Sequence, residues 1–219
     1  MMRRPINDRP VRTALGRDGF SRLFPVSRET LERLEAYVGL LRAWNRRINL
    51  IGANTMGDVW RRHILDSAQL APHLPANSRI LVDLGSGAGL PGLVLAATTA
   101  TLEAHLVEAD QRKAAFLREA ARIIGANVKI HAQRAENLSP IPADVVTARA
   151  VAPLPELLEM AARFARSDTR MLFLKGRTAA EELTLAGKTW KMAARLVPSI
   201  ADAGGMVLIL ESVARAPSL

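Results

Sequence analysis

Short apolar runs and amphipathic segments alternate through the last two thirds of the chain. Apolar runs of four to eight residues bounded by polar or turn residues are typical of buried strands, whereas apolar residues recurring every three or four positions are typical of helices. The pattern predicts strands at 79–84, 102–107, 128–131, 144–148 and 171–174, with helices at 93–97, 112–124 and 154–164. Such alternation predicts a mostly parallel, doubly wound α/β sheet.

The two ends of the chain depart from this alternation. Segments 191–197 and 206–210 flank a glycine-containing loop and predict an antiparallel hairpin at one edge of the sheet. Near the other end, Ser27 can cap a helix that reaches about Arg47, and a second helix is expected over 55–70. We therefore expect a basic, flexible, irregular arm at 1–24, a helical extension at 25–76 and a Rossmann-like domain at 77–219.

The first predicted strand runs into a turn with four glycines, in the segment ILVDLGSGAGLPG at 80–92. Glycine lets the backbone bend sharply and approach a ligand without a Cβ atom in the way. The helix predicted to follow would point its first amides into the turn. A turn of this kind at the carboxyl end of the first strand predicts a nucleotide-type pocket.

Asp83 bears on which nucleotide binds there. A carboxylate repels a pyrophosphate but suits a ligand with positive charge and hydrogen-bond donors, such as S-adenosylmethionine. The spacing Asp83-x-Gly85-x-Gly87-x-Gly89 is that of Rossmann-like methyltransferases. A G-x-G-x-x-G string ending at Gly92 leaves a dinucleotide, and hence an oxidoreductase, as the alternative, and a purely structural turn is a further one.

Three later strand ends carry candidate cofactor contacts. Glu108 ends the second strand, where doubly wound folds bind ribose hydroxyls. Ala135 and Glu136 follow the third strand, where a loop could line an adenine. Arg149 follows the fourth and is interpreted either as a clamp for substrate or cofactor or as a surface arginine.

The net charge of +9 is concentrated near the N-terminus, where the first 63 residues carry 13 basic and 6 acidic side chains. This asymmetry favours a phosphate-rich partner such as nucleic acid, although solvated helix faces can also be charged. The absence of cysteine excludes disulfides and cysteine nucleophiles and is compatible with a cytoplasmic protein. No membrane span, secretory signal or clustered metal ligands are expected.

Two polar strings lie within the predicted N-terminal helices. In the first, Trp44 could stack on an unpaired base while Arg46 and Arg47 hold phosphates. In the second, Arg62 and Asp66 are spaced for a helix ion pair, and His63 is either a base or a packed side chain.

The motifs that the sequence lacks limit which kinds of atom can accept the methyl group. Without cysteine, covalent methylation of a pyrimidine carbon is excluded. The segment after the fourth strand lacks the Asn/Asp-Pro-Pro-Tyr motif of exocyclic-amine methyltransferases, and no Lys-Asp-Lys-Glu set for ribose hydroxyls is evident. A ring nitrogen with a free lone pair, such as guanine N7, needs no general base, so positioning could supply most of the catalysis.

Several strings of the sequence recur in a known protein family. They are Leu90-Pro91-Gly92, Trp44-Asn45…Asn49-Leu50, Arg62-His63-x-Leu65-Asp66-Ser67, Arg134-Ala135-Glu136, Arg149-Ala150 and Leu174-Lys175-Gly176. Together they resemble the RsmG (GidB) family of bacterial 16S rRNA guanine-N7 methyltransferases, over a stretch from about Leu31 to about Leu210. The resemblance implies S-adenosylmethionine as the methyl donor and a guanine in the decoding-region loop of small-subunit rRNA as the acceptor.

The resemblance and the pocket argument together give a set of expected site residues. Glu108 stands where relatives usually carry aspartate, and Arg149 is expected to position the acceptor as well as contact the cofactor. We expect a cytoplasmic monomer that acts on 16S rRNA or the small subunit without a metal. The expected cofactor contacts are Asp83, Gly85, Gly87, Leu90, Glu108, Ala135, Glu136 and Arg149, and the expected RNA contacts are Arg46, Arg47, Arg62, His63 and Lys175.

Overall fold

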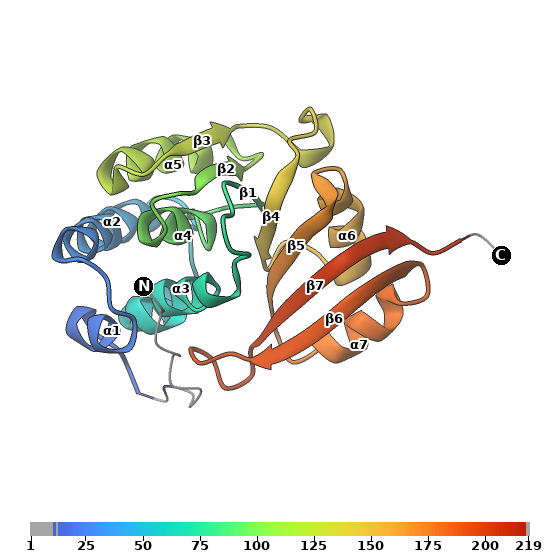
Figure 1. Ribbon diagram of the computed structural model, residues 1–219. Helices are drawn as coiled ribbons and strands as arrows, with labels where there is room; N and C mark the ends of the chain where they lie inside the picture. Colours follow the sequence, from blue (N-terminus) through green and yellow to red (C-terminus); the bar gives the residue numbers. More distant parts are fainter. Residues whose placement is uncertain (1–10, 12, 218–219) are drawn as a thin grey trace.

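A single sheet of seven strands organises the part of the chain that the computed structural model describes, residues 11 and 13–217 (Figure 1). The first five strands are parallel to one another, whereas β7 is antiparallel to both β5 and β6. The predicted parallel sheet with an antiparallel edge hairpin is confirmed. In spatial order the strands are β3 (Val128–His131), β2 (Glu103–Val107), β1 (Ile80–Leu84), β4 (Ala143–Arg149), β5 (Ala165–Lys175), β7 (Met206–Arg215) and β6 (Trp190–Pro198).

Helices cover both faces of this sheet (Figure 1). One core contains side chains of α2 (Arg28–Asn45), α4 (Gly92–Thr98) and α5 (Gln111–Ile124). The other contains side chains of α6 (Leu154–Ala162) and α7 (Ala179–Ala186). Leu81 belongs to the first core and Val82 to the second, as the alternation of a strand buried on both faces requires.

Side chains and glycines fix the ends of these helices. Ser27 caps α2 by accepting a hydrogen bond from the Thr30 amide, as its position predicted. Gly125 ends α5 with φ +63°, a left-handed conformation that glycine adopts without steric cost. The sequence did not predict α7, which begins directly after the loop that follows β5.

The N-terminal part differs from its prediction in one place. The expected irregular chain up to Phe24 is wrong for Arg17–Leu23, which form helix α1. Phe20 is fully buried there and packs against the rings of Phe24 and Trp60, which is a sufficient reason for this short helix to be ordered. Of the rest of the predicted arm, residues 1–10 and 12 lie outside the described residues.

The second expected helix is a composite of three helix types. It comprises a 3-10 turn η1 (Ala53–Asp58), a π-helical segment η2 (Trp60–Leu65) and one turn of α-helix, α3 (Asp66–Ala68), with a further 3-10 turn, η3 (Ala71–His73), after it. Hydrogen bonds in a π-helix join residues five apart rather than four apart. None of the helices in the described part of the chain has the length and apolarity needed to cross a membrane.

Candidate functional site

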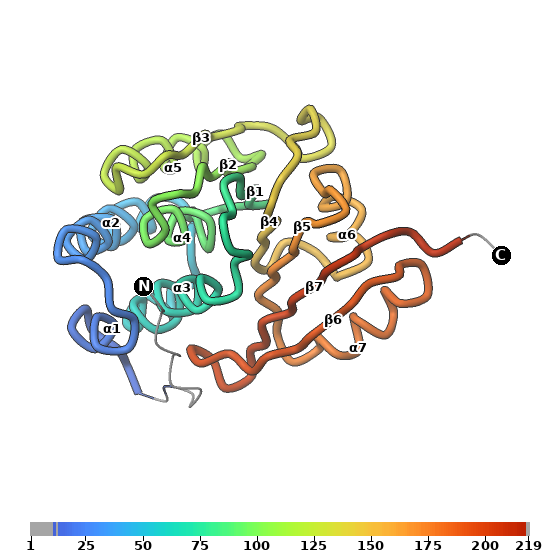
Figure 2. The backbone as a smooth tube through the Cα atoms, viewed as in Figure 1, coloured from blue at the N-terminus to red at the C-terminus, as the bar shows by residue number. Residues whose placement is uncertain are grey.

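A cavity of about 440 Å³ opens at the carboxyl ends of the central strands. Small-molecule sites commonly enclose roughly 300–1,000 Å³, so the cavity has room for a nucleotide-sized ligand. Three parts of the chain meet around it: the glycine turn after β1, the ends of β4 and β5, and a wall made from loop 50–52, segment η2 and the β6–β7 loop. Figure 2 follows the backbone from β6 into that loop, which lies beside α3.

The glycine turn is shaped by the absence of side chains. Gly85 has φ +59°, and a Cβ atom there would lie 2.7 Å from a methyl group of Val151. A Cβ atom at Gly92 would lie 2.5 Å from Leu106 Cδ2 and 2.7 Å from Asp83 Cβ, because α4 packs directly on β1 and β2. The turn therefore keeps a surface of bare backbone, with Gly85, Gly87 and Leu90 on the cavity lining.

Asp83 lies beneath this turn and is not on the cavity lining. Its carboxylate is fully buried and accepts hydrogen bonds from Thr147 Oγ1 at 2.7 Å and from the Gly92 amide at 3.3 Å. Burial raises the pKa of Asp83 to about 6 despite these bonds. The side chain thus joins β1, β4 and the start of α4 from behind the cavity wall.

Glu108 joins the glycine turn to the next strand. Its Oε2 accepts a hydrogen bond from the Gly87 amide at 2.9 Å, and its Oε1 accepts one from the Asp110 amide at 2.8 Å. Ala135 and Glu136 form the 3-10 turn η4 (Ala135–Asn137) just after β3. These three residues follow adjacent strands, beside the 440 Å³ cavity rather than on its lining.

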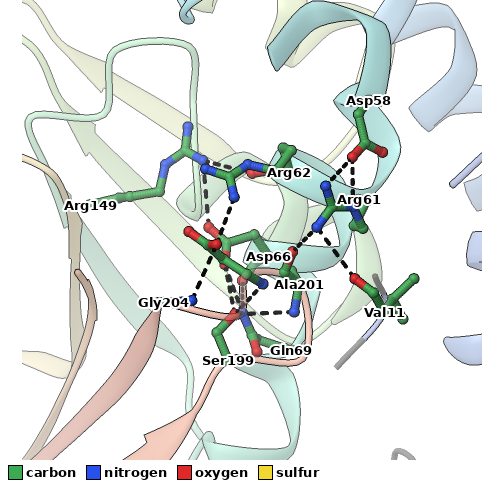
Figure 3. Close-up of polar contacts among 11 residues, drawn as sticks. Val11, Asp58, Arg61, Arg62, Asp66, Gln69, Arg149, Ser199, Ala201 and Gly204 are labelled. Atoms are coloured by element: carbon green, nitrogen blue, oxygen red, sulfur yellow. Dashed lines mark hydrogen bonds and ion pairs between the residues drawn. The ribbon is translucent and has the colours of Figure 1, made fainter. Parts of the chain in front are cut away.

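Arg149 reaches into the cavity from the end of β4 (Figure 3). Its Nη1 donates to His63 Nδ1 at 2.8 Å and lies 3.4 Å from the carbonyl oxygen of Arg62. The same nitrogen lies 3.6 Å from a carboxylate oxygen of Asp66. The structure therefore brings three residues of the second polar string together around the arginine predicted to clamp a ligand.

His63 has both ring nitrogens engaged. Nδ1 faces Arg149, and Nε2 lies 2.7 Å from Thr55 Oγ1. Burial, with the positive charges of Arg149 and Arg62, lowers its pKa to about 3. The imidazole is therefore neutral at physiological pH, and of the two roles proposed for it the packed, hydrogen-bonded one matches this geometry.

In place of the expected Arg62–Asp66 ion pair, both residues contact the β6–β7 loop. Arg62 forms an ion pair with Asp202 at 2.8 Å. Asp66 instead accepts hydrogen bonds from Gln69 at 2.8 Å and from Ser199 at 3.3 Å (Figure 3). Burial raises the pKa of Asp66, and the charge of Arg149 opposes that rise.

The loop contacts with the N-terminal part extend beyond the cavity. Arg61 forms an ion pair with Asp58 and donates to the carbonyl oxygens of Ala201 at 2.8 Å and Val11 at 3.3 Å (Figure 3). The Val11 amide donates in turn to the Ile200 carbonyl at 2.8 Å. Sequence reasoning missed this loop as part of the site, because nothing in its local pattern shows that it meets helices more than 130 residues away.

The first polar string supports the cavity in a way that differs from its prediction. Asn45 Oδ1 accepts from the amides of Leu50 and Ile51, both at 2.9 Å, and so fixes the loop that lines the cavity. Trp44, which was expected to stack on a base, packs its ring edge-on against Phe116 and donates from Nε1 to Glu119 at 3.1 Å. The two arginines that follow, Arg46 and Arg47, are exposed.

Two lysines line the cavity in addition to the arginines. Lys175 donates to the Ala152 carbonyl at 2.9 Å and pairs with Glu182 at 2.6 Å, so its charge is already compensated. Lys113, in the first turn of α5, was missed, although its place just after the second strand is a usable signal. Among the described residues, no group of three or more His, Cys, Asp or Glu side chains is arranged to hold a metal ion.

Solved structures share this fold at low sequence identity. A cofactor-bound protein from MTB superposes with a TM-score of 0.61 over 87% of this chain and 92% of that one, at 16% identity. A SAM dependent methyltransferase from Aquifex aeolicus superposes with a TM-score of 0.55 over 69% of this chain and 91% of that one, at 12% identity. The fold is therefore that of the Rossmann-like, S-adenosylmethionine-dependent methyltransferases.

Sequence relatives are much more similar. A protein of Rhodospirillum centenum named "Ribosomal RNA small subunit methyltransferase G" is 56% identical over 195 residues, which is 89% of this chain and 90% of its own length. A protein of Rhodospirillum rubrum with the same name is 52% identical over 91% of this chain and 98% of its own length. The model of the GidB family, described as rRNA small subunit methyltransferase G, matches residues 30–205. The chain therefore belongs to the rRNA small subunit methyltransferase G (GidB) family.

Proposed function

We propose that this protein transfers a methyl group from S-adenosylmethionine to N7 of a guanine in the decoding-region loop of 16S rRNA. Membership of the family supports the coarser activity, S-adenosylmethionine-dependent methylation of small-subunit rRNA. The choice of guanine N7 rests on the resemblance described above and on the chemistry of the cavity lining.

The observation that carries the proposal is the cavity itself, where a wall of bare glycine backbone faces Arg149. At Gly87, which is on the lining, a Cβ atom would have the Gly85 carbonyl oxygen, at 3.8 Å, as its nearest neighbour, so a ligand can approach the main chain there. Gly85, Gly87, Leu90 and Arg149 would hold the cofactor on the cavity side. Glu108, Ala135 and Glu136 would hold the ribose and adenine at the adjacent strand ends, with Asp83 shaping the methionine end from behind.

The side chains around the cavity suit an acceptor that needs no deprotonation. Bound S-adenosylmethionine supplies a methyl group on a positively charged sulfur. His63 is neutral with both nitrogens engaged, and Asp66 accepts two hydrogen bonds, so neither of these lining residues is a free general base. Guanine N7 carries a lone pair in its neutral form, and Arg149 can orient it by donating to the base or its phosphate.

The cations at the cavity mouth would hold the RNA. Arg46 and Arg47 are exposed next to the loop that lines the cavity, and Arg62 and Lys175 lie on the lining itself. The excess positive charge of the N-terminal third would attract the phosphate backbone from a distance. Arg62 would release Asp202 and Lys175 would release Glu182 on contact with RNA, because these side chains are paired at 2.8 Å and 2.6 Å respectively.

Mapping of N7-methylguanosine in 16S rRNA tests the proposal. We expect the mark to be lost when the gene is deleted, restored by the wild-type protein and not restored by Gly85→Asp. In vitro, the purified protein should methylate small subunits or 16S rRNA from the deletion strain. RNA binding without methyl transfer to either substrate would overturn the proposal in favour of a non-catalytic RNA-binding protein.

A further inference from the structure

His63 is a buried titratable group on the cavity wall for which methyl transfer to a ring nitrogen has no direct use. We infer that His63 is a neutral positioning residue: its Nδ1 holds the Arg149 guanidinium in the cavity, and its Nε2 ties that guanidinium to the loop at 50–52. The inference concerns the same site and rests on the proposed function only for its activity measurement.

The donor and acceptor pattern along this chain of groups fixes one tautomer. A guanidinium only donates, so Nδ1 must accept from Arg149 Nη1 at 2.8 Å. Nε2 then carries the proton and donates to Thr55 Oγ1 at 2.7 Å. The Thr55 hydroxyl has its own acceptor, the Gly52 carbonyl oxygen at 2.7 Å. Every group in the chain is satisfied with His63 neutral, and burial holds its pKa well below 6.5.

A neutral acceptor serves Arg149 better than a second carboxylate would. Within the described part of the chain, three contacts hold this guanidinium and each is made by Nη1: His63 at 2.8 Å, the Arg62 carbonyl at 3.4 Å and Asp66 at 3.6 Å. The guanidinium is thus anchored through one nitrogen while Nε and Nη2 keep their donors for a ligand. Because the short bond goes to a neutral ring, the positive charge is less compensated than in a close ion pair.

The other end of the chain of hydrogen bonds is loop 50–52. Gly52 belongs to the cavity lining, as do Leu50 and Ile51, whose amides are held by Asn45. His63 therefore connects the strand that carries Arg149 with this loop. Loss of Nδ1 would release the Arg149 guanidinium, whereas loss of Nε2 alone would release only the loop.

Amide side chains separate the two ring nitrogens experimentally. An asparagine places its amide near the position of Nδ1, where its oxygen can accept from Arg149, and a glutamine reaches the position of Nε2. We expect His63→Ala and His63→Gln to lower kcat/KM for methyl transfer by about tenfold or more, and His63→Asn to stay within about threefold of the wild type. His105→Asn is the matched control, since His105 is equally buried but lies outside the cavity, and it should leave kcat/KM unchanged.

A double-mutant cycle shows whether His63 acts through Arg149. On an Arg149→Ala background, His63→Ala should add less than about a twofold loss, because the positioned group is already missing. If activity is too low to measure there, the same cycle is read from cofactor affinity by calorimetry. Independent, additive losses, or equal recovery by asparagine and glutamine, would overturn the inference.

One measurement does not depend on methyl transfer. Nitrogen NMR of ring-labelled histidine should show His63 with a proton on Nε2 alone between about pH 5 and 8, a range in which an unperturbed histidine titrates. A proton on Nδ1, or titration near pH 6.5, would contradict the inference even in a fully active enzyme. Conversely, a wild-type protein that methylates no rRNA but shows this tautomer would overturn the proposed function and leave the positioning role standing.

Discussion

The two sides of the cavity are built in opposite ways. The glycine side, from β1 into α4, has its shape because glycines lack side chains and neighbouring side chains pack directly against their backbone. The facing side, from η2 and the β6–β7 loop, has its shape because side chains are present and hydrogen-bonded across long stretches of sequence. We therefore expect the glycine side to be disrupted by an added atom, and the hydrogen-bonded side by the loss of a hydrogen-bond partner.

The largest effect should come from adding one methyl group on the glycine side. Gly92→Ala places a Cβ atom 2.5 Å from Leu106 Cδ2 and 2.7 Å from Asp83 Cβ, so α4 must move away from β1. We expect the free energy of unfolding in urea to fall by about 3 kcal/mol, the upper end for overpacking.

A glycine in an open environment provides the control for this substitution. Gly39 lies within α2, and a Cβ atom there would have no neighbour within 4 Å. Gly39→Ala should therefore raise the free energy of unfolding by about 0.5–1 kcal/mol through helix propensity. Equal destabilisation by both substitutions would mean that close packing is not what sets the shape of the glycine side.

The hydrogen-bonded side should respond to pH in a way that the glycine side does not. The pKa of His63 is lowered to about 3 in the folded protein, against about 6.5 when unfolded, so below pH 6.5 only the unfolded chain takes up this proton. Stability from this group is complete above pH 6.5 and is lost as the pH falls toward 3. Between pH 7.5 and 5 the loss should be about 2 kcal/mol.

Comparison with His63→Asn isolates this contribution. Asp83 acts with the opposite sign, because its raised pKa favours the folded state as the pH falls from about 6 toward its unfolded value, but it is present in both proteins. The difference in unfolding free energy between wild type and variant should therefore shrink by about 2 kcal/mol on acidification. A constant difference across this range would show that His63 titrates normally.

A substitution at Glu108 tests whether the residues beside the glycine turn contact the cofactor. We expect Glu108→Ala to raise the S-adenosylmethionine dissociation constant about tenfold in calorimetry, because the carboxylate also holds the Gly87 amide. Glu103→Ala, at the other end of the same strand, should leave the constant unchanged. An unaltered constant in the Glu108 variant would remove this residue from the proposed cofactor contacts.

The smallest effect is expected at the outer rim of the hydrogen-bonded side. Arg46→Ala combined with Arg47→Ala should weaken binding to small subunits and reduce the salt dependence by about 1–2 units of log–log slope, with cofactor affinity intact. Arg28→Ala combined with Arg33→Ala removes two charges from the opposite end of the same helix, where each is paired with a glutamate. Identical salt slopes for both double variants would mean that α2 contacts RNA without a preferred end.

The two sides also differ in how well the sequence predicted them. The strand, the glycine turn and the following helix are contiguous, so local pattern was enough to place Gly85 and Gly87 on one cavity, whereas Leu90 was assigned from the family resemblance. The sequence did not predict Ser199 and Asp202 as site residues, because their partners lie more than 130 residues earlier. Only the pairing of β6 with β7 places the loop that carries them beside those partners. The packing of Trp44 on Phe116 likewise depends on how α2 meets α5.

The position of β7 inside the sheet, between β5 and β6, has a consequence for the order of folding. During synthesis the N-terminal helices emerge first, but their buried polar groups meet Ser199 and Ile200 only after the last two strands have been made. The contacts that complete the cavity therefore close some of the longest loops in the chain, which are slow to form because their closure entropy is largest. A nascent chain can assemble its glycine turn early, whereas the cavity is complete only after β6 and β7 have been made.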